Sequence, residues 1–285
     1  MAELDDLRLT DSSEPGPPLL EPPPRIGPSL LIPGLVIVGL IGIGAAIYFW
    51  PRSAPKPVQA SDHPVTSAPK PQAEAGDNIP LPLLDETDPL VRQLVSQLSS
   101  HPRVTAWLAT QGLLRNFAAV VVAIADGETP IAQLRKQRPT APFAVHDVTG
   151  ETIIDAASFR RYDSYADAVA GLDPRGTAKL YETLKPRIVE AYKDLGYPEG
   201  DIDGALNRAI IILLRTPPSN EHLAVKHTSV NWQFVDPRLE SLPQAQRQLL
   251  RMGPRNQKII QDKLQEIAPY LGFDVGQKTE SGRQK

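Results

Sequence analysis

One apolar segment constrains this chain more than any other feature. Between Ser29 and Trp50 the sequence SLLIPGLVIVGLIGIGAAIYFW holds no charged residue over 22 positions. As a helix with a rise of about 1.5 Å per residue it would be roughly 33 Å long, enough to cross a hydrocarbon layer of about 30 Å. Aromatic residues at its end, such as Tyr48 and Trp50, favour the membrane interface. The segment therefore predicts one transmembrane helix.

A signal peptide and a buried core helix are the two alternatives to a membrane anchor. A signal peptide has a positively charged leader and an apolar core of about 7–15 residues. Here the leader is long and acidic and the apolar run is longer, although Val58-Gln59-Ala60 does resemble a cleavage site. A buried core helix is disfavoured because proline-rich segments flank both sides. We expect a retained helix that lies in the lipid bilayer.

The orientation of the anchor is predicted mainly by analogy. Arg8 and Arg25 precede the segment, whereas Arg52, Lys56 and Lys70 follow it, so the positive-inside rule leans slightly against a cytoplasmic N-terminus. A short head, one anchor and a proline-rich leash before a large domain is nevertheless the usual layout of bacterial envelope proteins. We expect a bacterial inner-membrane protein with a cytoplasmic N-terminus and a periplasmic C-terminal domain.

Proline content divides the rest of the chain. Residues 1–80 contain 15 of the 30 prolines, and proline lacks the N–H that helices and central strands need. We therefore expect a disordered acidic and proline-rich head over 1–28 and a Pro/Ala-rich linker over 51–80. A globular domain is predicted over 81–272, followed by a polar tail over 273–285.

Apolar residues at helical spacing dominate the predicted domain, which indicates a mainly α fold with a minor β-hairpin. Thr87 is expected to cap the first helix. A later apolar stripe over 181–195 contains Pro186, so a kink or a restart is predicted there. Asp201 or Asp203 is expected to cap the next helix.

Turn residues locate the remaining elements. Thr149-Gly150 lies between two short β-type runs and predicts a hairpin. A strand pair or an irregular segment is expected over 223–234. Two helices, roughly 243–252 and 254–271, are separated by Gly253-Pro254, because glycine ends a helix and proline opens one.

Several classes of chemistry are disfavoured by composition. The chain has no cysteine, which excludes thiolate catalysis and Cys-based metal sites. A formal net charge of −3 provides no overall positive potential of the kind that attracts nucleic acid.

Motifs for metal binding and catalysis are also missing from the sequence. The histidines form no metal-binding helix pair, and Asp201-Ile-Asp203-Gly204 lacks the glycine and acid that complete a calcium loop. No serine-nucleophile or Walker motif is present, and an acid pair such as Glu151 with Asp155 is unspecific. We predict no catalytic residue, metal or cofactor.

Two clusters are candidate ligand or partner contacts. Phe159-Arg160-Arg161-Tyr162-Asp163 places two guanidinium groups between aromatic residues, a combination that could hold a carboxylate or phosphate. The alternative is an internal brace in which one arginine pairs with Asp163 or Asp167 and the tyrosine packs in the core.

The second cluster lies between the last two helices and includes Arg251, Arg255 and Asn256. Free backbone N–H groups at the start of a helix favour anions, so this junction is a candidate anion contact. The alternative is a helix–helix corner with solvated arginines.

Four separate stretches carry a resemblance to a known family. They are IPLPLLDETDPLVRQLVSQLSSHP, SFRRYDSYADAVAGLD, LYETLKPRIVEAYKDLGYP and LLRMGPRN. Together they resemble the uncharacterised bacterial family catalogued as domain of unknown function 3014, over about 80–272. The resemblance implies a bacterial protein with an N-terminal anchor and an inner-membrane home, and it implies no activity and no catalytic residue.

The resulting hypothesis is a binding or adaptor module that docks an envelope protein or an anionic wall or lipid component. Two alternatives are a cell-envelope hydrolase, which a cleft with converging acids or a Ser–His pair would favour, and a structural homodimer.

Overall fold

The computed structural model describes residues 76–77, 79–197, 200–229 and 231–276. The predicted transmembrane segment, the head, nearly all of the linker and the end of the tail lie outside these residues. Within them, no single helix is both long and apolar enough to cross a membrane, although α3 (Pro102–Leu108) and α4 (Leu113–Ala125), which meet at 109°, would suffice by length and composition as a bent pair.

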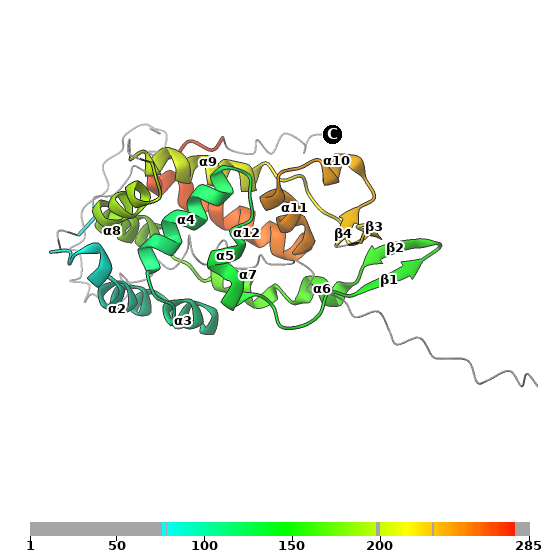
Figure 1. The fold of residues 1–285 in the computed structure, drawn as a ribbon, viewed down its shortest axis with the longest axis horizontal. Coiled ribbons are helices and arrows are strands. Elements are labelled where there is room, and N and C mark those ends of the chain that lie inside the picture. Colours follow the sequence, from blue (N-terminus) through cyan, green and yellow to red (C-terminus); the bar gives the residue numbers. More distant parts are fainter. Residues whose placement is uncertain (1–75, 78, 198–199, 230, 277–285) are drawn as a thin grey trace, which may run out of the picture.

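The described chain is mainly helical, as predicted (Figure 1). The α-helices are α2 Asp88–Leu98, α3 Pro102–Leu108, α4 Leu113–Ala125, α5 Ile131–Leu134, α6 Ala156–Arg160, α7 Asp163–Ala170, α8 Pro174–Asp194, α9 Ile202–Leu214, α10 Pro237–Glu240, α11 Gln244–Arg251 and α12 Pro254–Ile267. Short 3-10 turns are η1 Leu84–Glu86, η2 Arg135–Gln137 and η3 Ala268–Leu271. The strands are β1 Val145–Val148, β2 Glu151–Ile154, β3 Val225–His227 and β4 Trp232–Phe234.

The main core surrounds α4, which packs against α8 and α9. Apolar residues along one face of α4 are buried, including Leu113, Phe117 and Val121, each at most 1% exposed. The opposite face, which carries Arg115 and Asn116, is only half-buried, as expected for an amphipathic helix. Helix α12 completes the cover by packing on α7, α8 and α9, and Phe273 and Val275 continue the packing past Gly272.

Both predicted strand pairs form hairpins, and the hairpins lie edge to edge. In the first, Thr149 and Gly150 have φ angles of 50° and 88°, the two positive values that a tight two-residue turn requires. The N–H of Ile154 in β2 donates to the carbonyl of Leu223, just before β3, at 3.0 Å. A second, smaller hydrophobic cluster lies under the hairpins and includes Phe159, Phe234 and Leu250.

Two sequence predictions about helices hold only in part. Thr87 occupies the N-cap position of α2 as predicted, but its side chain makes no cap hydrogen bond, because its hydroxyl donates to the carbonyl of Leu84. Of the kink or restart predicted at Pro186, the restart does not occur, since α8 runs through this proline as one element. Leu184 and Ile188, on either side of the proline, are both fully buried, and this packing holds the two halves together despite the missing N–H. Asp201 does cap α9, by accepting from the N–H of Gly204 at 2.8 Å.

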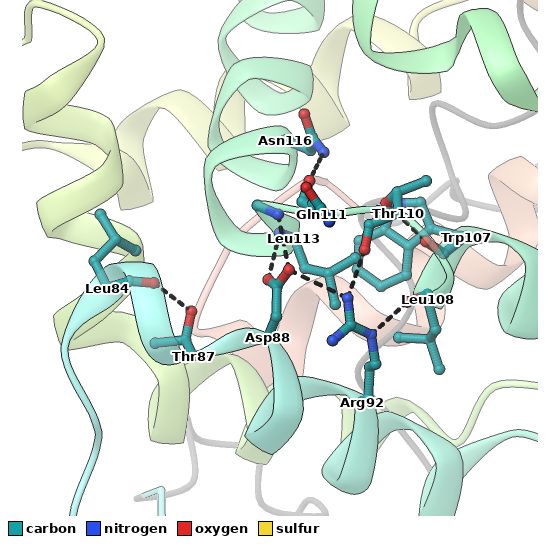
Figure 2. A network of polar contacts seen from close by, with 11 residues as sticks. Leu84, Thr87, Asp88, Arg92, Trp107, Leu108, Thr110, Gln111, Leu113 and Asn116 are labelled. Carbon is teal, nitrogen blue, oxygen red and sulfur yellow. Dashed lines mark hydrogen bonds and ion pairs between the residues drawn. The ribbon is translucent and has the colours of Figure 1, made fainter.

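A polar network fixes α2 to the start of α4 (Figure 2). The carboxylate of Asp88 accepts hydrogen bonds from the N–H groups of Gly112 and Leu113, both at 2.8 Å. Arg92 pairs with the same carboxylate and donates to the carbonyls of Leu108 and Thr110. The side chain of one helix therefore satisfies the free backbone donors of another.

The start of the described chain is docked on α8. The N–H of Asp77 donates to the hydroxyl of Thr183 at 2.8 Å, and its carboxylate pairs with Lys179 at 2.7 Å. The two hairpins lie at the opposite end of the long axis of the molecule (Figure 1). The domain thus has an N-terminal end, built on α2 and α8, and a hairpin end.

Candidate functional site

The two candidate clusters lie side by side near the hairpin end. Asn256, which is only 1% exposed, donates from its amide to the carbonyl of Phe159 at 3.0 Å and to the carboxylate of Asp163 at 2.9 Å. Arg255 pairs with Asp167 at 2.8 Å and lies 3.6 Å from Asp163. These contacts fix the start of α12 against the α6–α7 junction.

Gly253 allows this close approach. Its φ of 85° and ψ of 164° suit glycine alone among the common residues. A Cβ at this position would lie 2.5 Å from Cγ of Phe159. The glycine therefore ends α11, lets α12 begin at once and leaves room for an aromatic ring of α6.

The side chains of the first cluster have different environments. Arg160 is exposed, whereas Arg161 is half-buried and points inward. Arg161 donates from Nε to the carbonyl of Ser158 and from Nη1 to that of Ala141, both at 3.1 Å. Its guanidinium carbon lies 5.2 Å from the ring centre of Tyr162 and 5.5 Å from that of Phe143. Burial lowers the pKa of Arg161.

Arg251 of α11 has a similar environment. It donates from Nη2 to the carbonyl of Trp232 at 2.9 Å, and its guanidinium carbon lies 4.7 Å from the ring centre of Phe234. Burial lowers its pKa. Guanidinium groups stack well on aromatic faces, which compensates part of the cost of removing them from water.

Tyr162 is fully buried. It lies next to the guanidinium group of Arg161 and is close enough to Arg251 to be affected by its charge. Burial raises the pKa of its hydroxyl to about 12, while the charges of Arg161 and Arg251 act in the opposite direction. The amide of Gln248 lies beside this hydroxyl, yet the two do not reach hydrogen-bonding geometry. The phenol is therefore a neutral donor near two cations.

These residues form one group that we call the arginine–aromatic cluster. Its members are Phe143, Arg161, Tyr162, Trp232, Gln248 and Arg251. Arg161 lies over the ring of Phe143, whose centre is 6.1 Å from that of the Trp232 ring, and Arg251 donates to the backbone carbonyl of Trp232. The sequence prediction missed Phe143, Trp232 and Gln248. Gln248 could have been found, because it precedes Arg251 by three residues and so shares its helix face.

Other candidate chemistry receives less support from the geometry. Among the described residues, no group of three or more His, Asp or Glu side chains could hold a metal ion. Of the acid pair that the sequence left unspecific, Asp155 accepts the N–H of Ala157 at the start of α6 and its carboxylate lies 3.0 Å from Nδ1 of His146. A cavity of about 20 Å³ lies in the main core, lined mostly by apolar residues such as Phe117 and Leu206. That volume suits about one water molecule.

The described residues form a mainly helical domain with two small hairpins. A family model described as "Protein of unknown function (DUF3014)" matches residues 113–268. The match covers more than half of the chain, and the chain belongs to this family. It includes every member of the arginine–aromatic cluster. No curated protein and no solved structure matches the chain.

Proposed function

We propose that this protein is a membrane-tethered binding or adaptor module of the bacterial cell envelope. Residues 29–50 anchor it in the inner membrane with the N-terminus in the cytoplasm. The helical domain lies in the periplasm, where it docks an envelope protein or an anionic wall or lipid component. The leash of residues 51–80 reaches roughly 30 Å as a coil, so the domain searches space beyond the bilayer surface.

One observation carries the binding proposal. Arg161 and Arg251 are packed among aromatic rings and, within the described residues, neither forms an ion pair with a carboxylate. Desolvated cations normally have an anionic partner. A partner from outside the chain would supply it, and arginine next to aromatic rings is a common composition of binding hot spots.

The position of the cluster supports the same proposal. The start of the described chain is docked on α8, whereas α6, α11 and β4, which carry or adjoin cluster residues, lie toward the hairpin end (Figure 1). A leash attached at one end leaves the other end free to meet a partner away from the membrane.

Site-specific photo-crosslinking in cells tests the proposal. Val235 at the hairpin end and Leu83 at the N-terminal end are both exposed apolar residues, at 48% and 64%. Each is replaced in turn by a photoreactive phenylalanine analogue in the full-length chain. We expect a discrete adduct from position 235 and none from position 83. The absence of an adduct at 235, or the same adduct at both positions, would contradict the proposal.

The membrane topology is a separate prediction. Alkaline phosphatase and a fluorescent protein are fused in turn after Lys285. We expect phosphatase activity without fluorescence, because the phosphatase folds only outside the cytoplasm. Fluorescence without phosphatase activity would place the domain in the cytoplasm and refute the predicted orientation.

A further inference from the structure

Four buried donor groups of the arginine–aromatic cluster have no hydrogen-bond partner within the described part of the chain. They are Nη2 of Arg161, the hydroxyl of Tyr162, Nε2 of Gln248 and Nε of Arg251. A buried donor without a partner is costly, so native structures rarely keep several in one place without a ligand, ion or water to accept them.

The donors belong to neighbouring residues from separate elements. Tyr162 links α6 to α7 and is fully buried, while Gln248 and Arg251 come from α11. The phenol is affected by both guanidinium charges, and the amide of Gln248 lies beside it. Three of the four groups carry only donor hydrogens at these atoms, and the fourth is a hydroxyl that can donate. The complementary ligand is therefore an acceptor.

The local charge indicates that this acceptor is an anion. Glu240 acts on Arg251 electrostatically, but its carboxylate is already paired with Arg247 and accepts the N–H of Phe234. Arg161 has no acidic partner among the described residues. The cluster thus holds more positive than negative charge in a place where water is largely excluded.

We propose that the arginine–aromatic cluster binds one carboxylate group, which accepts from the Tyr162 hydroxyl, the Gln248 amide and the two guanidinium groups. This inference rests on the proposed function and names the ligand chemistry of the same site. The half-buried rings of Phe143 and Trp232 contact the carbon part of the ligand. A carboxylate has about four lone-pair positions, which matches the four free donors. A singly charged, planar group also costs less to remove from water than a phosphate dianion.

Acetate is the probe that tests this inference. Thermal unfolding of the full-length chain in non-ionic detergent is followed at pH 7 in sodium acetate and in sodium chloride of equal ionic strength. A ligand that binds only the folded state raises the melting temperature with concentration. We expect acetate to stabilise the wild type relative to chloride.

Two matched variants make the test specific. Tyr162→Phe removes the buried hydroxyl without changing the packing, and Tyr197→Phe makes the same change at a partly exposed tyrosine. We expect Tyr162→Phe to weaken acetate binding about tenfold, since a hydrogen bond to a charged group is lost, and Tyr197→Phe to behave as the wild type. In chloride, Tyr162→Phe should melt at the same or a higher temperature, because no hydrogen bond is lost there.

Two results would overturn the inference. One is an equal acetate shift, or none, in all three proteins, which is the outcome if the donors are satisfied by water alone. The other is a Tyr162-dependent shift with inorganic phosphate but not with acetate. Comparison of trialanine, its C-terminal amide and galacturonate then identifies whether a peptide end or a sugar acid is the source. A discrete crosslink from position 235 together with no acetate effect would remove this inference and leave the proposed function standing.

Discussion

Replacing Gly253 by alanine is expected to destabilise the domain by about 2–6 kcal/mol. The backbone there has φ 85° and ψ 164°, a region that costs a residue with a Cβ about 1–3 kcal/mol. The added Cβ would also lie 2.5 Å from Cγ and 2.7 Å from Cβ of Phe159. Phe159 is buried in the smaller hydrophobic cluster, so its ring has little room to move, and overpacking adds about 1–3 kcal/mol. Urea unfolding of the full-length chain measures the loss.

Gly150→Ala is the matched control for this prediction. Gly150 has a φ of 88°, nearly the same as Gly253, but nothing lies within 4 Å of a Cβ placed there. We expect the control to lose only about 1–2 kcal/mol, from backbone strain alone. Equal losses in the two variants would show that α12 and α6 do not approach as closely as the structure places them.

Replacing Asp88 by alanine is the second change with a large expected effect. The Asp88 side chain is only 16% exposed, and its carboxylate accepts two backbone N–H groups at the start of α4 as well as pairing with Arg92 (Figure 2). Alanine leaves both backbone N–H groups without this acceptor and removes the ion-pair partner of Arg92. Loss of a helix cap and of charge-assisted hydrogen bonds predicts a decrease of about 2–4 kcal/mol in the free energy of unfolding.

Asp85→Ala controls for the loss of one negative charge in the same region. The Asp85 side chain is 83% exposed and pairs with Arg115 on the surface. Exposed ion pairs contribute at most about 1 kcal/mol, so this variant should unfold close to the wild type. If urea unfolding gave both variants the same stability, the hydrogen bonds of Asp88 between α2 and α4 would contribute nothing to the free energy of unfolding.

Periodic and turn signals predicted much of the fold. The Thr149-Gly150 hairpin, a cap at Asp201 or Asp203 and the Gly253-Pro254 junction were all readable, because each depends on residues close together in the sequence. The unbroken course of helix α8 through Pro186, where a kink or a restart was predicted, was not readable, for the opposite reason. Its continuity depends on the burial of Leu184 and Ile188 against other helices, which local sequence does not report.

The candidate site was predicted only in pieces. The two arginine clusters were treated as separate, whereas Asn256 of one donates to Asp163 of the other. That contact joins positions far apart in the chain. Phe143 and Trp232 were missed because they belong to different hairpins and approach each other only through tertiary packing. Residue types suggested arginine–aromatic chemistry, but only the fold shows that Arg161 and Arg251, rather than Arg160, take part in it.

The proposed function puts attachment and binding at opposite ends of the domain. Asp77 and Lys179 hold the start of the described chain on α8, and α6, α11 and β4 lie toward the hairpin end (Figure 1). We propose that the anchor and leash set where the domain can reach and that the arginine–aromatic cluster sets what it binds there.

The most direct test of the central claim is the crosslink from position 235 with and without the two buried arginines. The full-length chain carries the photoreactive residue at 235, either alone or with Arg161→Gln and Arg251→Gln, and an Arg160→Gln and Arg238→Gln pair serves as the exposed control. Matched melting temperatures establish that each protein is folded. We predict an adduct that the buried pair of substitutions reduces at least tenfold and the exposed pair leaves unchanged. An adduct of equal yield in all three proteins would contradict binding through the arginine–aromatic cluster.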